Sequence, residues 1–215
     1  MPNAPERSLE KIMPLLSMKR PPPHKLFFAK LEVRLNPTDL ERIGFAYNVS
    51  KYGHAKQLRD DGTRYFDHPK AVACIAIEEF ECLDPHVIIL ALLHDTDEDS
   101  YLMSMYRLGH NFGEEMALDV CGITKLPKGK ETTEEYLGRV IDRGARVIFV
   151  KLCDRLHNLR ELGNCKPEKT ARQLAETKAY HIPLLLTALR RFGGQWVEYA
   201  ERTEQKMLEI IALYE

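Results

Sequence analysis

The feature that most constrains the fold is an unbroken apolar run, VIILALL at residues 87–93, which follows Pro85. A helix that is apolar on every side is buried, because no face of it can meet water favourably. Pro85 suits the first turn of such a helix, where its missing N–H costs nothing. The run is far shorter than the ~20 residues that a membrane-spanning helix needs. The sequence therefore predicts a buried helix in the core of a globular domain.

The rest of the chain is also predicted to be helical. From residue 37 onward the apolar positions follow a helical period, and alternating, strand-like runs are nearly absent. Thr38 or Asp39 is the expected cap of a helix that runs towards Leu58, and another helix is expected to open at Pro69. Further helices are expected at 100–109, 113–121, 132–143, 145–162, 168–192 and 195–214. The predicted fold class is all-α.

The length of 215 residues indicates one domain with attachments, since domains average roughly 150 residues. Residues 1–36 are rich in proline, which forbids a long helix, and are predicted to be a flexible or surface-draped arm, with partner binding as the alternative. Residues 37–194 form the predicted helical domain. Residues 195–215 are predicted to be a C-terminal helix that packs on this domain or on a second subunit, so a homo-oligomer stays open.

Composition and charge exclude several classes of protein. Hydrophobic residues make up 44% and charged residues 29%, which is typical of globular chains. The 31 basic and 32 acidic residues give a net charge of −1, so neither nucleic acid nor a membrane is an expected partner. Five scattered cysteines without a C-x-x-C pair are typical of a reduced protein. Because no N-terminal apolar segment indicates secretion, a cytoplasmic location is expected.

The predicted buried helix ends abruptly in a charged segment, HDTDED at residues 94–99. Four carboxylates so close together would repel one another, and a metal ion is the usual compensation. His94 and Asp95 are adjacent and could hold one ion from the same side. Glu98 follows His94 by four residues and is expected one turn along, towards a bound water. A solvated acidic loop is the alternative interpretation.

Two further segments favour the metal site over the acidic loop. His68 precedes a proline at the mouth of a predicted helix, although a lone histidine there is more often a cap than a ligand. Lys151, Asp154 and Asn158 have the spacing i, i+3, i+7 and share one face of an otherwise apolar helix. A buried aspartate needs a partner, and a metal ion would serve. The three segments together are much stronger than any one of them.

The pattern resembles the HD superfamily of metal-dependent phosphohydrolases and, more closely, the hydrolase domain of the RelA/SpoT homologue family. The family pattern H-x-x-Q-x-R-x-x-G-x-x-Y-x-x-H-P matches HAKQLRDDGTRYFDHP at residues 54–69. Its A-L-L-H-D-x-x-E-D matches ALLHDTDED at 91–99, and its V-K-L-A-D-R-L-H-N-x-R matches VKLCDRLHNLR at 150–160. The resemblance covers roughly residues 40–190.

The resemblance implies hydrolysis of the alarmone (p)ppGpp at its 3′-pyrophosphate, which gives GDP or GTP and pyrophosphate. It implies four metal ligands, which are His68, His94, Asp95 and Asp154. The ion that this family usually holds is Mn²⁺, although the same ligand types also suit Fe²⁺, Co²⁺ or Zn²⁺.

The resemblance also implies the roles of five other residues. Glu98 and Asp99 would position and deprotonate the attacking water. Arg59 and Asn158 would contact the nucleotide, and Lys151 lies near the site and is counted with them.

Charge around the predicted site bears on the substrate. Residues 139–160 carry six Arg or Lys against two Asp, a net charge of +4 that we expect to steer phosphates inward. Departures from the family pattern include Asp60 and Asp61 after Arg59, Asp97 in the acidic segment, and His181 where a tyrosine is common. These changes are expected to affect specificity rather than abolish activity.

Two alternative functions stay open. The scaffold could act on another phosphorylated nucleotide, such as NADPH at its 2′-phosphate. A regulatory module that binds alarmone without turning it over is a different class of protein, but it would not need Glu98 and Asp99. A role as antitoxin to an alarmone synthetase is a matter that one chain cannot test.

Overall fold

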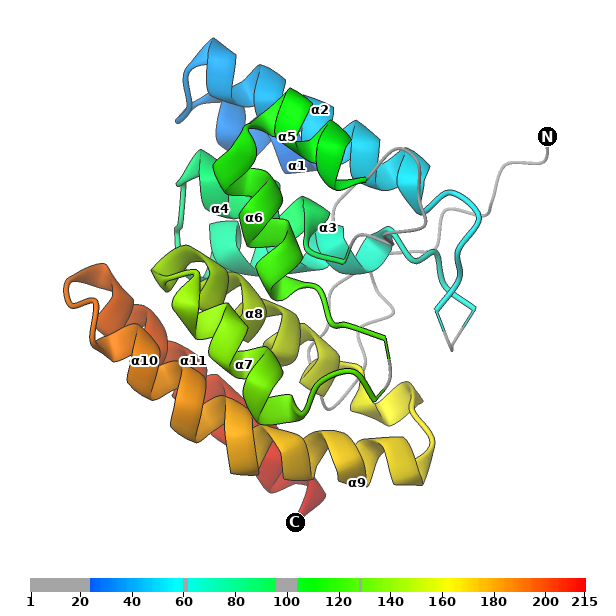
Figure 1. Ribbon diagram of the computed structural model, residues 1–215, viewed down its shortest axis with the longest axis vertical. Helices are drawn as coiled ribbons and strands as arrows, with labels where there is room; N and C mark the ends of the chain where they lie inside the picture. The colour runs from blue at the N-terminus through cyan, green and yellow to red at the C-terminus, as the bar shows by residue number, and fades with distance from the viewer. Residues whose placement is uncertain (1–23, 60–61, 96–103, 128) are drawn as a thin grey trace.

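The computed structural model describes residues 24–59, 62–95, 104–127 and 129–215 (Figure 1). In these residues every regular element is a helix, and the only extended pairing is an isolated bridge between Leu58 and Arg64. The α-helices are α1 (His24–Glu32), α2 (Pro37–Gly53), α3 (Asp67–Cys74), α4 (Pro85–Leu93), α5 (Met105–Phe112), α6 (Glu114–Ile123), α7 (Thr133–Asp142), α8 (Ala145–Arg160), α9 (Pro167–Glu176), α10 (Thr187–Arg190) and α11 (Gln195–Ile211). The predicted all-α fold is confirmed.

Four short helical segments of other types complete the described part. Two are π-helical, η1 (Ile75–Glu79) and η4 (Thr177–Leu186), and two are 3₁₀-helical, η3 (Leu162–Asn164) and η5 (Ala212–Tyr214). The helix expected at 168–192 is therefore continuous from α9 through η4 to α10, with a π-helical middle. Pro183 lies inside η4, and a proline lacks the N–H of an α-helical turn and crowds the preceding turn.

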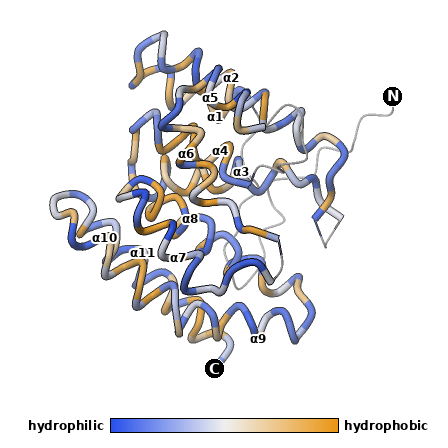
Figure 2. Tube along the Cα trace, viewed as in Figure 1, coloured by the Kyte–Doolittle hydropathy of each residue, from blue (hydrophilic) through white to orange (hydrophobic). Residues whose placement is uncertain are grey.

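Helix α4 is the centre of the hydrophobic core, as the apolar run predicted. Asp84 caps its N-terminus by accepting a hydrogen bond from the His86 N–H at 2.9 Å, and Pro85 takes the first turn. All side chains of residues 87–93 are fully buried. The helix packs against α2, α3, α6 and α8, and hydrophobic residues concentrate in this interior (Figure 2).

Helix α8 is the second buried helix, and it carries polar residues into the core. It begins after Gly144, whose φ of +97° belongs to the left-handed region that favours glycine. Its contacts with α3 and α4 bring Asp154 towards His68 in α3 and His94 at the end of α4. The crossing of these three helices therefore positions the candidate site.

The start of α2 differs in detail from the prediction. The cap is Asn36 rather than Thr38 or Asp39, because the Asn36 side chain accepts a hydrogen bond from the Asp39 N–H at 2.9 Å. The helix also ends at Gly53, well before Leu58. Leu58 instead belongs to the bridged turn that follows.

The predicted arm at residues 1–36 is wrong for residues 24–32, which form helix α1. The segment after the last proline has an apolar face, and Phe27, Phe28 and Leu31 are buried in the core. Phe27 lies 5.4 Å from Tyr47 of α2, measured between ring centroids. Residues 1–23 lie outside the described part of the chain.

The C-terminal helix α11 packs on the chain's own domain. Tyr199, Ala200 and Met207 are buried in the core, and the Tyr199 ring stacks on Phe149 of α8 at 4.7 Å. This apolar face of α11 is therefore covered by α8 of the same chain.

An ion-pair network centred on Glu79 fastens α11 to the rest of the bundle. The Glu79 carboxylate accepts two hydrogen bonds from Arg160 of α8, at 2.5 and 2.8 Å, and lies 2.9 Å from Lys206 Nζ of α11. Arg202 donates to the Glu79 backbone carbonyl. Burial raises the pKa of Glu79, but Arg160 and Lys206 outweigh it and hold the pKa below its ordinary value.

We predict that Glu79→Gln lowers the free energy of unfolding by about 1.5–3 kcal/mol at pH 7, because hydrogen bonds to a charged group are lost. Urea unfolding measures this difference. A carboxylate with a depressed folded pKa stabilises the fold above its ordinary pKa of 4.5, and this contribution is lost as pH falls through the folded value. The difference in the free energy of unfolding between the wild type and Glu79→Gln should therefore become smaller at acidic pH.

Glu198→Gln is the matched control for this prediction. Glu198 pairs with Arg202 on the exposed surface of α11, where such pairs contribute about 0–1 kcal/mol. If Glu79→Gln and Glu198→Gln lowered the free energy of unfolding equally, the Glu79 network would stabilise the fold no more than an exposed ion pair does.

Candidate metal centre and pocket

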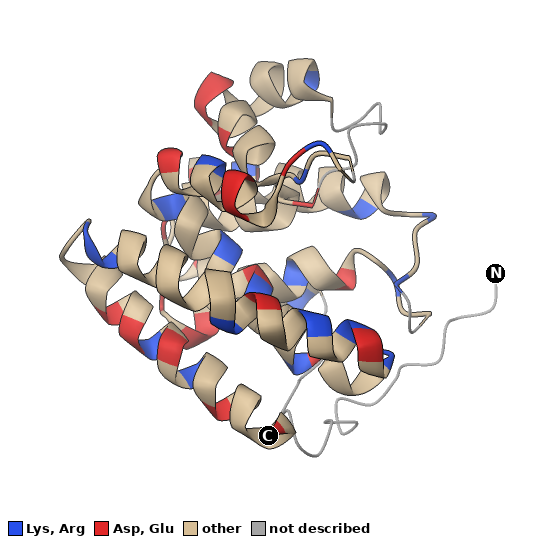
Figure 3. Cartoon of the chain, turned by 60° about the horizontal axis from the view of Figure 1, so that its bottom comes forward, with Lys and Arg blue, Asp and Glu red and all other residues tan. Residues whose placement is uncertain are grey.

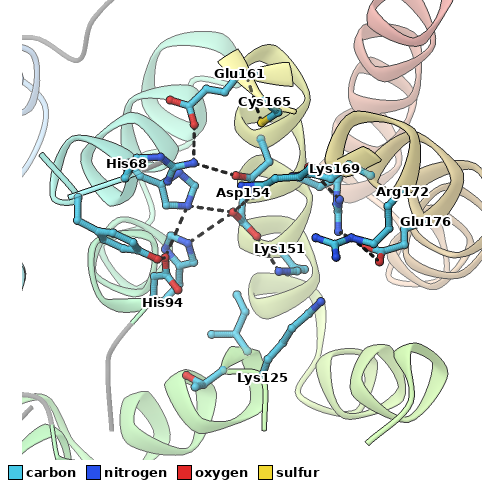
Figure 4. Close-up of a pocket in the computed structure, with 18 of the residues that line it drawn as sticks. His68, His94, Lys125, Lys151, Asp154, Glu161, Cys165, Lys169, Arg172 and Glu176 are labelled. Carbon is cyan, nitrogen blue, oxygen red and sulfur yellow. Dashed lines mark hydrogen bonds and ion pairs between the residues drawn. The ribbon is translucent and has the colours of Figure 1, made fainter. Parts of the chain in front are cut away.

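Three buried side chains meet where α3, α4 and α8 cross. His68 comes from α3, His94 follows the last residue of α4, and Asp154 lies in the middle of α8. Asp154 Oδ1 is 3.1 Å from His68 Nε2 and 3.7 Å from His94 Nε2. Each residue is at least 96% buried. Figure 4 shows both histidines on the same side of Asp154.

The hydrogen bonding of His94 tests whether this group fits a metal ion. His94 Nδ1 donates to the Ala91 carbonyl at 2.8 Å, so a neutral ring has its lone pair on Nε2. That Nε2 atom is buried and has no hydrogen-bond partner among the described residues. Ligand atoms of His68, His94 and Asp154 lie within 4.8 Å of one another. Two imidazoles and a carboxylate with a free, inward-facing nitrogen suit a divalent transition metal.

The Asp154 carboxylate is held as an anion by its neighbours. Lys151 Nζ donates to Oδ2 at 2.6 Å, and Asn158 Nδ2 donates to Oδ1 at 2.6 Å. Burial raises the pKa of Asp154, but Lys151 and the two histidines outweigh it and hold the pKa well below its usual range. Lys151 and Asn158 therefore both contact Asp154, and the i, i+3, i+7 spacing on α8 correctly placed the three on one face.

Asp95 lies at the edge of this group rather than within it. Its Oδ2 is 4.0 Å from His68 Nε2, and its side chain is 39% exposed. The Tyr65 hydroxyl donates a hydrogen bond to the same oxygen. Burial and the Asp95 charge raise the pKa of Tyr65, so this hydroxyl keeps its proton. The structure thus brings three of the four predicted ligands together and the fourth next to them.

Arg59 and Asn158 lie side by side on the pocket wall. Arg59 Nη2 donates to Asn158 Oδ1 at 3.3 Å and to Glu161 Oε2 at 2.5 Å. The guanidinium also lies 5.8 Å from the centre of the Tyr65 ring. Sequence reasoning did not single out Glu161 or Tyr65, although both lie within or directly after the recognised motifs.

His157 is another residue that the sequence analysis did not select. Its Nδ1 is 2.9 Å from His68 Nδ1, and both rings are buried. Burial lowers the pKa of His157 well below its usual range, and the neighbouring His68 and Arg59 lower it further. The only available signal was its position in the VKLCDRLHNLR motif, three residues after Asp154.

Five residues that the sequence analysis named fall outside the described part of the chain. Glu98 and Asp99 follow the metal group in sequence, but the structure describes nothing between residues 96 and 103. Asp97 lies in the same undescribed segment, and Asp60 and Asp61 are undescribed as well.

The candidate metal group lines a pocket of ≈670 Å³, which is within the usual range for small-molecule sites. Several cations line the pocket, namely Arg59, Lys125, Lys151, Arg155, Lys169 and Arg172. Figure 4 shows Lys169 and Arg172 of α9 across Asp154 from the histidines. Burial and the nearby Lys151 lower the pKa of Lys125, which reflects the crowding of positive charge. Four carboxylates line the pocket as well, namely Asp95, Asp154, Glu161 and Glu176, so the lining keeps a formal excess of two positive charges and suits an anionic ligand.

The source of this positive charge differs from the prediction for residues 139–160. Only Lys151 and Arg155 of the six cations line the pocket. The other four form ion pairs elsewhere, Arg139 with Glu131, Arg143 with Asp119, Arg146 with Asp84 and Arg160 with Glu79. Charges of both signs are interspersed over the helices in the same way (Figure 3). A net charge counted along residues 139–160 does not indicate which face of a helix each cation occupies.

The HD-domain family matches residues 46–184, a span that contains His68, His94, Asp95 and Asp154. The chain belongs to the HD-domain family. The predicted resemblance is confirmed by its relatives. The bifunctional (p)ppGpp synthase/hydrolase SpoT of Escherichia coli is 37% identical over 194 residues, which cover 86% of this chain and 26% of SpoT. A probable GTP pyrophosphokinase of Mycobacterium leprae is 36% identical over 75% of this chain and 20% of its own length.

This HD-domain chain spans about a quarter or less of the length of these relatives. A solved structure, described as a metazoan ortholog of SpoT that hydrolyzes ppGpp, matches it with a TM-score of 0.60 and 23% identity. The match covers 77% of this chain and 94% of the other. At this identity the likeness shows the fold. No described helix is both long and apolar enough to cross a membrane.

We predict that Mn²⁺ raises the melting temperature of the metal-stripped HD-domain protein, because an ion that binds only the folded state stabilises it. Asp154→Asn should abolish this rise, since the variant loses the carboxylate that both histidines face. Thermal unfolding with and without Mn²⁺ measures both effects. Glu131→Gln, which changes a carboxylate paired with Arg139 outside the pocket lining, is the control and should keep the rise. An unchanged rise in Asp154→Asn would contradict this metal site.

Proposed function

We propose that the chain is a cytoplasmic (p)ppGpp hydrolase that removes the 3′-pyrophosphate and gives GDP or GTP and pyrophosphate. The observation that carries the proposal is a pocket that joins a buried His68, His94 and Asp154 group to a wall of cations. A metal group alone would suit many hydrolases, and the cations favour a substrate with several phosphates. The relatedness to SpoT of Escherichia coli supports the alarmone as that substrate.

In this proposal His68, His94, Asp95 and Asp154 hold one Mn²⁺ ion. Such an ion, when bound, lowers the pKa of a water molecule from 15.7 towards about 7 and polarises a phosphoryl oxygen. Lys151 donates to Asp154 and keeps its carboxylate anionic and oriented. The Tyr65 hydroxyl orients Asp95 in the same way.

Two carboxylates complete the proposed chemistry. Glu98 and Asp99, which follow the metal group in sequence, position the attacking water and accept its proton. A positioned general base contributes roughly 10²–10⁴ in rate. Pyrophosphate leaves as the P–O bond to the ribose 3′-oxygen breaks, and that oxygen takes up a proton.

The remaining pocket residues bind the nucleotide. Arg59 and Asn158 contact it from one wall, next to the metal group. Lys125, Lys169 and Arg172 supply positive charge to the phosphates from the pocket lining. The proposed reaction uses residues of one chain only.

The test is release of pyrophosphate from ppGpp by the purified, Mn²⁺-loaded protein. We expect release by the wild type and a loss of at least about 100-fold in Asp95→Ala and in Glu98→Ala, because the first removes a ligand and the second a base. Asp142→Ala is the control, since Asp142 lies on α7 outside the pocket lining.

Each other outcome identifies a different function. Release of orthophosphate from NADPH without pyrophosphate from ppGpp would replace the alarmone by another phosphorylated nucleotide. Tight ppGpp binding without turnover by the metal-loaded protein would indicate a regulatory module. Turnover that is unchanged in Glu98→Ala would contradict the assignment of the base.

A further inference from the structure

A continuous series of contacts leads from the pocket wall to the candidate metal ligand His68. Arg59 donates to Glu161 Oε2 at 2.5 Å. The same oxygen lies 3.6 Å from His157 Nδ1, and His157 Nδ1 lies 2.9 Å from His68 Nδ1. The last atom of the series, His68 Nε2, faces Asp154 Oδ1 at 3.1 Å. The four residues come from the turn after α2, the end of α8 and the start of α3.

The contact between the two Nδ1 atoms forces a choice of tautomer. A hydrogen bond between two imidazole nitrogens holds one proton, so one ring donates and the other accepts. A metal ion needs an unprotonated ring nitrogen. If His68 offers Nε2 to an ion, its own proton is on Nδ1 and is donated to His157 Nδ1. His157 then carries its proton on Nε2.

Glu161 acts on the same choice. A carboxylate oxygen 3.6 Å from His157 Nδ1 favours a proton on that nitrogen, which would make His157 the donor. His68 Nδ1 would then accept, and the His68 proton would move to Nε2, where it excludes a metal ion. Arg59 opposes this effect because it neutralises the Glu161 carboxylate directly.

We propose that the Arg59–Glu161 ion pair and His157 are one positioning unit that sets the tautomer of His68 and thereby its affinity for a metal ion. With Arg59 in place, the Glu161 charge is compensated and His157 Nδ1 is left as an acceptor. The pocket-wall arginine thus acts on the metal centre through Glu161 and His157, which are not among the four proposed metal ligands. This inference rests on the metal site of the proposed function but not on its substrate.

The position of Glu161 indicates that the pair is more than a structural bridge. Glu161 caps the C-terminus of α8, where the helix dipole disfavours a negative charge. Both side chains of the pair are only 17% exposed, so its charges are poorly solvated. A helix end that needed only a stable cap would be better served by a cation or an amide at this position.

The experiment measures Mn²⁺ affinity by calorimetry on metal-stripped protein, without any substrate. We expect Arg59→Met to raise the dissociation constant about tenfold, as changes in the partners of metal ligands commonly do. In the double variant Arg59→Met/Glu161→Gln, the Mn²⁺ dissociation constant should return to within about threefold of the wild-type value, because the carboxylate that Arg59 neutralises is gone as well. If the ion pair had only a structural role, the double variant would bind Mn²⁺ no more tightly than Arg59→Met does.

The matched control is the ion pair of Arg139 and Glu131, which lies outside the pocket lining. Arg139→Met should leave the Mn²⁺ dissociation constant unchanged. Thermal unfolding of each metal-stripped variant establishes that it is folded. Histidine ¹⁵N NMR of the Zn²⁺-loaded wild type should show His68 protonated on Nδ1 and His157 on Nε2.

Four results would overturn the inference. A folded Arg59→Met protein that binds Mn²⁺ with the wild-type dissociation constant would contradict the coupling between Arg59 and the metal site. A double variant that binds Mn²⁺ as weakly as Arg59→Met would contradict it too. A His68 ring protonated on Nε2 in the Zn²⁺-loaded protein would remove the tautomer assignment. A wild type that binds no Mn²⁺ would overturn the metal site as well, whereas metal binding as expected without ppGpp turnover would overturn only the proposed substrate.

Discussion

The structure depends on one buried negative charge, the Asp154 carboxylate in the middle of an apolar helix. An isolated carboxylate in the core would cost several kcal/mol, so the surrounding helices must supply positive or polar partners. Lys151 and Asn158 do so from α8 itself, and His68 and His94 do so from α3 and α4. The same requirement that keeps the fold stable therefore gathers the groups that suit a metal ion.

The core and the site are mechanically connected. Helix α4 has no polar face and is enclosed by α2, α3, α6 and α8. His94 directly follows the last residue of α4, so the packing of this helix places His94 where α3, α4 and α8 cross. The Glu79 network fastens α11 to η1 and to the end of α8. Glu161 follows at the C-cap of α8, so the stability of that helix end also bears on Arg59 and His157.

The pocket combines two charge patterns that the chain keeps apart in sequence. Its acidic and histidine side comes from α3, α4 and α8, whereas Lys169 and Arg172 come from α9. Both sides line the same pocket of ≈670 Å³, and they meet where Glu176 of α9 pairs with Arg155 of α8 at 3.5 Å. A polyphosphate substrate that binds a metal ion at one end satisfies both sides, which is the physical basis of the proposed alarmone hydrolysis.

Apolar periodicity is a local property, so the sequence was enough to predict the helical fold and the buried α4, and its motifs predicted the three residues of the candidate metal group. Tertiary structure alone decided that α1 packs on α2, which cations face the pocket, and that Tyr65, His157 and Glu161 join the site. Arg59 and Glu161 are 102 residues apart in the chain and meet only because the turn after α2 lies against the end of α8. Charge counted along residues 139–160 could not indicate this, since four of its six cations pair with carboxylates outside the pocket.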